Sequence, residues 1–337
     1  MSVRYTERGS GSALADFLAE HAQVLSITGF FLLCVIFFSA SADAFLTSAN
    51  LFNILRQAAP ILVVAVAMTY VIITAGIDLS VGSQVALINA LAAIILSGGW
   101  LPWPLVVFGM LALGALIGLV QGWFVAYQGI PAFIVTLAGL SIFRGLALYL
   151  TQGYSIPIKD LPSFLALGRG QVASVPVPAV IAVSIAVLGT VVLARTVYGR
   201  RVVAVGSNPE AARRAGMPAR GTIASVYMLT GVASAVAGLL IAARLGSGSS
   251  NAAVGLELQV IAAVVLGGTS LFGGRGSILG TILGTMTIAL IGNGLILMHI
   301  SPFFTQIVTG MIILVAIWLN TRIFTANFRF GKRRAQG

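Results

Sequence analysis

The sequence predicts an all-α, polytopic helical membrane protein, and three observations support that prediction. Of its 337 residues, 58% are hydrophobic and only 8% are charged, and the mean hydropathy is +1.05. In soluble domains about a quarter of the residues are charged, so this composition is not that of a soluble domain. The apolar runs are mostly about 20 residues long and do not alternate with polar residues, which favours membrane-spanning helices over barrel strands.

Ten apolar runs predict about ten transmembrane helices. In chain order they cover 24–41, 57–75, 79–97, 103–127, 131–150, 176–195, 220–243, 257–271, 277–298 and 302–320. The eighth run is short for a full crossing, so it either spans or re-enters the membrane. The predicted organisation is a tail over 1–23, one transmembrane domain over 24–321, and a basic tail over 322–337.

The basic residues predict how these helices are oriented. Fourteen lie on one side of the ten runs: Arg4, Arg8, Arg195, Arg200, Arg201, Arg213, Arg214, Arg220, Arg275, Arg322, Arg329, Lys332, Arg333 and Arg334. Five lie on the other side: Arg56, Arg144, Lys159, Arg169 and Arg244. Cytoplasmic loops carry the excess of Lys and Arg, so both termini are predicted to be cytoplasmic. This bias explains the net charge of +11 without any nucleic-acid partner.

The largest cytoplasmic loop, residues 195–221, carries the signals of one short helix. They are an N-cap, a proline at the first position, an acid in the first turn, two bases in the last turn and a glycine beyond it: Asn208, Pro209, Glu210, Arg213, Arg214 and Gly216. So short a helix is marginal alone in water. It is therefore either a connector packed on its own protein or headgroups, or an element that docks into a partner's groove.

Asp78 lies in "TAGIDLSVGS", residues 74–83, between two apolar runs. We favour an N-cap for the helix beginning near Leu79, with the carboxylate accepting from the amide of Ser80 or Val81 near the cytoplasmic surface. The alternative is a residue that borders a translocation path, because carboxylates are rarely left in a membrane without a purpose. Gly76 and Gly82 allow close packing around this turn.

Broken or re-entrant helices are predicted near 76–82 and 257–274. "GIDLSVG" at 76–82 and "GTSLFGG" at 268–274 share glycine and leucine at matching offsets, and discontinuous helices in corresponding halves are typical of transporters. Candidates for a helix break or a polar path, besides Gly76, Asp78 and Gly82, are Ser80, Gln84, Asn89, Gln121, Thr136, Gly268, Ser270, Gly274 and Asn293. Hydrogen bonding between helices is the alternative role for the polar members.

The chain resembles a known transporter family at three places. "EAARRAG", Glu210 to Gly216, resembles the EAA-x-x-x-G start of the coupling loop of ABC importer permeases, although "VYML" at 226–229 departs from the usual I-x-L-P. That departure indicates a divergent branch. "ITAGIDLSVGS" at 73–83, "GNGLILMHISPF" at 292–303 and the order of segments resemble the permeases of ribose-type and other monosaccharide importers.

The resemblance implies a pore-forming subunit in the bacterial inner membrane. It implies a separate cytoplasmic ATPase, coupled through Asn208, Pro209, Glu210, Ala211, Ala212, Arg213, Arg214 and Gly216. It also implies a periplasmic or extracellular solute-binding protein, a second permease copy or a homologous permease, and contact with membrane lipid. At the external face, Glu257 and Gln259 either start a helix or contact this receptor.

The chain contains no G-x-x-x-x-G-K-[ST] phosphate loop and no catalytic cluster, so we expect no enzyme and no cofactor here. ATP and Mg are expected on the partner ATPase, and no metal site is expected. The alternative function is an ion-coupled secondary carrier or uniporter without an ATPase. Such carriers typically need several intramembrane carboxylates, of which this chain has few. The identity of the solute and of the second permease stays open.

Overall fold

The computed structural model describes residues 10–301 and several residues beyond: Phe304, Ile307, Val308, Gly310, Met311, Leu314, Val315 and Trp318. The predicted helix 302–320 therefore lies mostly outside the described residues. The predicted tail 322–337 and the first nine residues of the tail 1–23 lie wholly outside them.

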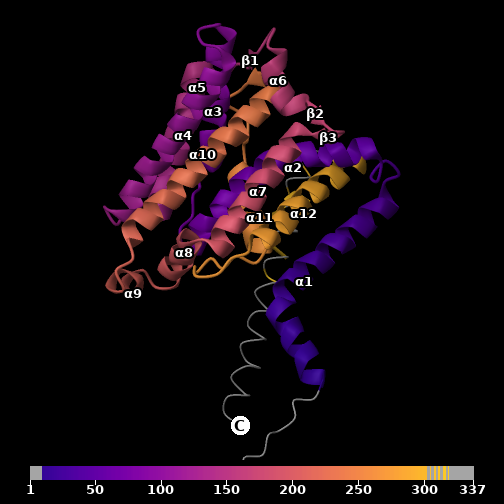
Figure 1. Cartoon of the computed structure of the whole chain (residues 1–337). Helices are drawn as coiled ribbons and strands as arrows, with labels where there is room; N and C mark the ends of the chain where they lie inside the picture. Colours follow the sequence, from indigo (N-terminus) through magenta and orange to yellow (C-terminus); the bar gives the residue numbers. More distant parts are fainter. Residues whose placement is uncertain are drawn as a thin grey trace, which may run out of the picture.

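Helices make up almost all of the regular structure in this part of the chain (Figure 1). They are α1 (Ser10–Ser41), α2 (Ser48–Ile73), α3 (Val81–Ser97), α4 (Trp103–Ala126), α5 (Ala132–Thr151), α6 (Pro162–Arg169), α7 (Val177–Arg195), α8 (Val197–Ser207), α9 (Pro209–Arg214), α10 (Ala219–Leu245), α11 (Leu256–Leu266) and α12 (Ile278–Leu297). The strands are β1 (Ile156–Pro157), β2 (Gln171–Val172), β3 (Val175–Pro176) and β4 (Ser247–Gly248). β1 pairs antiparallel with β4, and β2 with β3.

Seven of the described helices are long and apolar enough to cross a membrane, and α3 and α11 are shorter apolar helices. The chain is thus a polytopic helical membrane protein, as predicted. α11 has 11 residues, which at about 1.5 Å each is roughly half the hydrocarbon thickness. The predicted run 257–271 was too long, because glycines at 267 and 268 end the helix five residues earlier.

Two further boundaries differ from the prediction because polar residues continue the helices. α1 begins at Ser10 instead of residue 24. α2 begins at Ser48 instead of residue 57, and the Thr47 side chain caps it by accepting from the amide of Asn50. An unpredicted helix, α8, fills much of the loop 195–221, with Thr196 as its cap.

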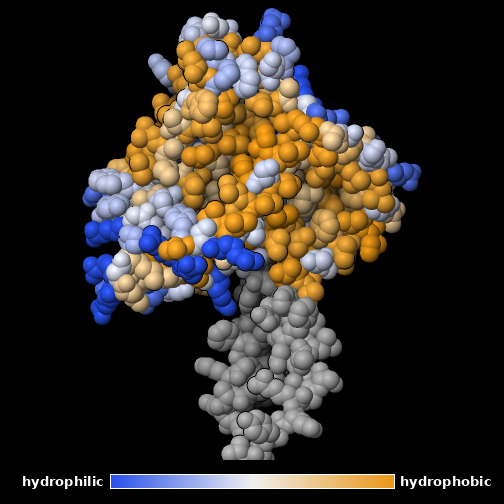
Figure 2. Space-filling view, in the orientation of Figure 1, coloured by the Kyte–Doolittle hydropathy of each residue, from blue (hydrophilic) through white to orange (hydrophobic). Residues whose placement is uncertain are grey.

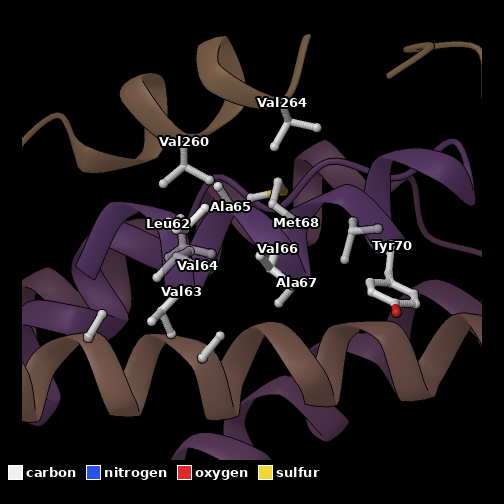
Figure 3. Packing of buried hydrophobic residues seen from close by; sticks show 14 of the residues in the cluster. Leu62, Val63, Val64, Ala65, Val66, Ala67, Met68, Tyr70, Val260 and Val264 are labelled. Atoms are coloured by element: carbon white, nitrogen blue, oxygen red, sulfur yellow. The ribbon is translucent and has the colours of Figure 1, made fainter. Parts of the chain in front are cut away.

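The core is built around α2, whose second half is almost completely buried. Figure 3 shows Val260 and Val264 of α11 facing Leu62 and Met68 of α2. Ala182 and Ala186 of α7 belong to the same cluster. The second half of α2 therefore lies between other helices and is shielded from lipid.

α4 and α10 pack closely because glycines face one another between them. A Cβ on Gly114 or Gly118 would collide with the backbone carbonyl of Gly231 or Tyr227. Gly114 and Gly118 are four residues apart and so lie on one face of α4, which permits the close approach of two helix backbones.

The outer surface carries large apolar side chains around its middle. Phe108, Ile142 and Leu188 are each more than half exposed. Figure 2 shows hydrophobic atoms across the middle of the visible face and hydrophilic atoms gathered at the end that carries β1 and α6 and at the end that carries α8 and α9. This is the surface of a protein that sits in a bilayer with both ends in polar surroundings.

Candidate functional site

The connection 74–80 between α2 and α3 places a carboxylate inside the helix bundle. Asp78 is completely buried. Its Oδ1 accepts from the amide of Ser80 at 2.9 Å and from the Ser80 hydroxyl at 2.6 Å. Its Oδ2 accepts from the hydroxyl of Thr230 on α10 at 3.1 Å. The connection is thus tied both to the start of α3 and to a distant helix.

The predicted cap at Asp78 is confirmed in its bond to Ser80, with two differences. α3 begins at Val81 with Ser80 at the cap position, so Asp78 closes a turn just before the helix. Its partner Thr230 lies eleven residues into α10, about 16 Å along the axis from Ala219. Asp78 is thus buried within the bundle, and its predicted place near the cytoplasmic surface stays a prediction.

Two glutamines extend this arrangement into a polar cluster. The Gln84 amide nitrogen donates to the Ser80 hydroxyl at 2.7 Å and to the Gln121 carbonyl oxygen at 3.0 Å. The Gln121 amide nitrogen donates to the same hydroxyl at 2.8 Å. We call Asp78, Ser80, Gln84, Gln121 and Thr230 the Asp78 cluster; all five are buried.

The cluster retains unused hydrogen-bonding capacity. The side-chain oxygen of Gln84 is buried without a hydrogen-bond partner, and the hydroxyl of Tyr227 is buried beside Ile77. A Cβ on Gly76 would lie 2.5 Å from that Tyr227 hydroxyl, so the absence of a side chain at Gly76 leaves room for it. A buried polar atom without a partner is costly, so the Gln84 oxygen is a ready acceptor for a further hydrogen bond.

The start of α3 also meets α11. A Cβ on Gly82 would collide with the Glu257 carboxylate, one oxygen of which is buried without a partner. Arg144 of α5 donates to the carbonyls of Ser250 and Ala252, just before α11. The predicted helix start at Glu257 is confirmed, since α11 begins at Leu256. A receptor-facing role for Glu257 and Gln259 stays a prediction.

Two other predicted residues lie away from the Asp78 cluster. Asn293 exchanges two hydrogen bonds of 2.9 Å with Asn50, joining α12 to α2. Asn89 accepts from the amide of Ser249 at 2.7 Å and so anchors the segment after β4. Both residues link helices and loops, which was the alternative role for polar residues in the predicted path.

The helix predicted near 208–216 is present as α9. The Asn208 side chain accepts from the amide of Ala211 at 2.9 Å, and Pro209 occupies the first position. Glu210 pairs with Arg213 at 3.0 Å and with Arg214 at 3.1 Å. Hydrogen bonds from Arg213 and then Arg214 lower the pKa of Glu210, so the carboxylate stays charged at neutral pH.

One face of α9 is held against the protein and the other is free. Ala212 is buried in a small cluster with Val205 of α8 and Ala219 of α10. The side chains of Glu210, Arg213 and Arg214 are exposed. Gly216 has φ +79°, the left-handed conformation expected after the helix. α9 is thus a fixed, charged projection at one end of the molecule (Figure 1).

The connection 267–277, between α11 and α12, meets the end of α2 and the end of α8. The amide of Gly274 donates to the carbonyl of Ile73 at 2.8 Å. A Cβ on Gly206 of α8 would collide with the same carbonyl and lie 2.9 Å from the Gly274 nitrogen. The predicted residues Gly268, Ser270 and Gly274 all lie in this connection. The structure therefore joins the second break to α8, the helix that precedes α9.

Three members of this site escaped sequence analysis: Thr230, Tyr227 and Gly206. Thr230 and Tyr227 lie in an apolar run where no spacing marks them, and only the packing of α10 brings them to Asp78. A signal for α8 did exist, since Thr196 is followed by apolar residues at 198, 202 and 205, which share one face of a helix. Within the described residues, no three His, Cys, Asp or Glu side chains lie close enough to hold a metal ion.

Comparisons with known proteins place these features in a family. Residues 50–317 match the model of a family described as the permease component of the branched-chain amino acid transport system. The probable ABC transporter permease protein YphD of Escherichia coli K12 is 41% identical over 93% of this chain and 94% of its own length. The ribose import permease protein RbsC of Bacillus subtilis 168 is 41% identical over 87% and 91%. The xylose transport system permease protein XylH of Escherichia coli K12 is 35% identical over 89% and 92%. No solved structure matches the chain.

Proposed function

This chain belongs to that family of ABC transport permease components, and we propose that it forms the pore of a binding-protein-dependent importer for a monosaccharide or sugar-like solute. It is a multi-pass protein of the bacterial inner membrane. Its family implies two partners, an ATPase and a solute-binding protein. The names of the ribose and xylose relatives support a sugar as the solute.

The observation that carries this proposal is the geometry of α9. A capped helix of six residues is packed on α8 and α10 through Ala212, while its ion-paired face projects outward. A helix held in this way moves with whatever grips its free face. Residues 208–216 couple the permease to the ATPase, and ATP and Mg bind to that partner.

We infer the orientation from the same end of the molecule. The α9 end carries Arg200, Arg201, Arg213 and Arg214, in agreement with the excess of basic residues on the cytoplasmic side. Both termini are then cytoplasmic and about ten helices cross the bilayer or enter it. The receptor docks at the opposite end, which carries α6 and the β1–β4 pair.

The Asp78 cluster borders the path of the solute. Sugar hydroxyls both donate and accept hydrogen bonds, and the unpaired Gln84 oxygen offers an acceptor for them. Alternation between inward and outward states would exchange the bonds of this cluster, because its members belong to α3, α4 and α10. A second permease, identical or homologous, completes the pore, and lipid covers the remaining apolar surface.

Reconstitution separates this function from that of a secondary carrier. The chain is placed in liposomes alone, or together with the ATPase and receptor recovered from its native host, and uptake of labelled pentoses and hexoses is measured. We expect uptake only with all partners and with ATP, and no effect of ionophores. Uptake by the chain alone that an ionophore abolishes would identify a secondary carrier instead.

A further inference from the structure

A tight loop beside α9 presents an aromatic side chain to solvent. The loop 270–275 lies within the connection between α11 and α12. Phe272 at its tip is 94% exposed, more than any other large hydrophobic side chain in the described part of the chain. Leu271 next to it is 44% exposed. An exposed aromatic residue on an ordered loop is typical of the anchor of a protein interface.

Hydrogen bonds hold this loop in one conformation. The Gly273 amide donates to the Ser270 carbonyl, and the Ser270 amide donates to the Arg275 carbonyl, both at 3.0 Å. The Phe272 amide donates to the Ser270 hydroxyl at 3.3 Å. Gly273 and Gly274 have φ of +82° and +74°, which other residues rarely adopt. Docking of a preformed loop loses little conformational entropy.

The loop and α9 form one continuous surface. A Cβ on Gly274 would lie 2.6 Å from the hydroxyl oxygen of Ser207, and Ser207 directly precedes Asn208, the cap of α9. The neighbouring charged side chains of Glu210, Arg213 and Arg214 are exposed. Charged groups require water, so a loop that contacts Ser207 beside them lies at a polar end of the molecule, and we infer that Phe272 lies outside the hydrocarbon.

We propose that the loop 270–275 is a second docking element for the ATPase that engages α9, with Phe272 as the anchor that fills an apolar pocket on that partner. This inference rests on the proposed function. Through this loop the ATPase would contact the connection between α11 and α12 directly, in addition to its contact with α9. The hydrogen bond from the Gly274 amide to the Ile73 carbonyl links this contact to the end of α2 and to the connection that carries Asp78.

Photo-crosslinking in the assembled complex tests the contact. Benzoylphenylalanine replaces Phe272, Arg214 on α9 or, as a control, Phe108, which is 70% exposed on the apolar face of α4. We expect crosslinks to the ATPase from positions 272 and 214 and none from 108. A crosslink from 214 without one from 272 overturns the inference and leaves the proposed function intact. Failure at both positions contradicts the proposed function itself.

An affinity measurement tests the anchor separately. Phe272→Ala in nanodiscs should weaken binding of the ATPase about tenfold or more, because an aromatic anchor is lost. Phe272→Trp should retain most of the affinity, and Phe108→Ala should bind as the wild type does. Wild-type affinity in Phe272→Ala would show that Phe272 is not an anchor.

Discussion

At the scale of single residues, Asp78 acts as a hydrogen-bond acceptor that joins three parts of the chain. Its two oxygens receive donors from Ser80 and Thr230, and none of the described residues forms an ion pair with it. We therefore expect an acceptor at this position to be more important than a negative charge. The charge itself is costly in a bilayer, so a neutral acceptor should be tolerated.

Replacement of Asp78 separates these two properties. Asp78→Asn keeps one oxygen for Ser80, and its amide group can donate to the Thr230 hydroxyl, so folding, assembly and ATP-driven uptake should be close to wild type. Asp78→Ala leaves buried donors unpaired and should lower the free energy of unfolding by about 1–3 kcal/mol. Thermal unfolding in detergent and uptake in vesicles measure the two effects. A well-folded Asp78→Asn variant without uptake would mean that the ionised carboxylate serves transport directly.

The identity of the residues indicated which side chains are candidates for the site, but it did not indicate which residues they contact. Asp78 stood out because a carboxylate in an apolar stretch is expensive. Its bond to Ser80 was predictable because that residue is two positions away. Thr230 is 152 residues away, and only the packing of α10 against α3 and α4 brings it to Asp78. The pairing of Asn293 with Asn50 was unpredictable for the same reason.

At the scale of elements, close helix contacts depend on missing side chains. Gly118 of α4 meets the Tyr227 carbonyl of α10, a backbone atom that has no rotamer by which to move away. Gly109 of the same helix has nothing within 4 Å of its Cβ position. Gly109 therefore serves as a control for Gly118 in the same helix.

Alanine at these two positions should have opposite consequences. Gly118→Ala should destabilise the protein by about 1–3 kcal/mol, because the extra methyl group overpacks the α4–α10 contact. Gly109→Ala should be neutral or slightly stabilising, because alanine favours the helix. The melting temperatures of the two variants in the same detergent provide the comparison. Equal melting temperatures would contradict the packing described for this interface.

The cap of α9 provides a second test at this scale. Asn208→Ala removes the acceptor for the Ala211 amide and should destabilise α9 locally by about 1 kcal/mol. Asn208→Asp keeps the acceptor and serves as the control. Hydrogen exchange of the amides in 209–214 should rise in the alanine variant and stay low in the aspartate variant. Unchanged exchange in both would mean that Ala212 and the ion pairs alone hold the helix.

The sequence predicted elements well where the signals were local. The cap, proline and glycine of α9 were all readable, because capping involves residues three or four positions apart. The nine helices that match predicted runs were readable from hydropathy. α8 was missed because its apolar face is narrow and it lies in a basic loop. The end of α11 was misplaced because an apolar run does not reveal where glycines turn the chain.

At the scale of the whole molecule, two breaks lie between α9 and the core. The connection 267–277 touches α8 at Gly206 and α2 at Ile73, and the connection 74–80 leads from Ile73 to Asp78. The end of α8, which leads into α9, thus joins the buried polar cluster through short contacts. We therefore expect a partner that moves α9 to displace the elements around Asp78.

Co-purification decides whether α9 holds an ATPase. The tagged chain is isolated in mild detergent from membranes of its native host, as wild type and as the Glu210→Ala/Arg213→Ala double variant, and the accompanying proteins are identified by mass spectrometry. We predict that an ATPase accompanies the wild type and is lost from the double variant, while both chains fold equally well. Equal recovery of the ATPase with both chains would contradict the coupling role of α9. If the wild-type chain is isolated without an ATPase and still transports solute alone, the proposed function as an ATP-driven importer is wrong.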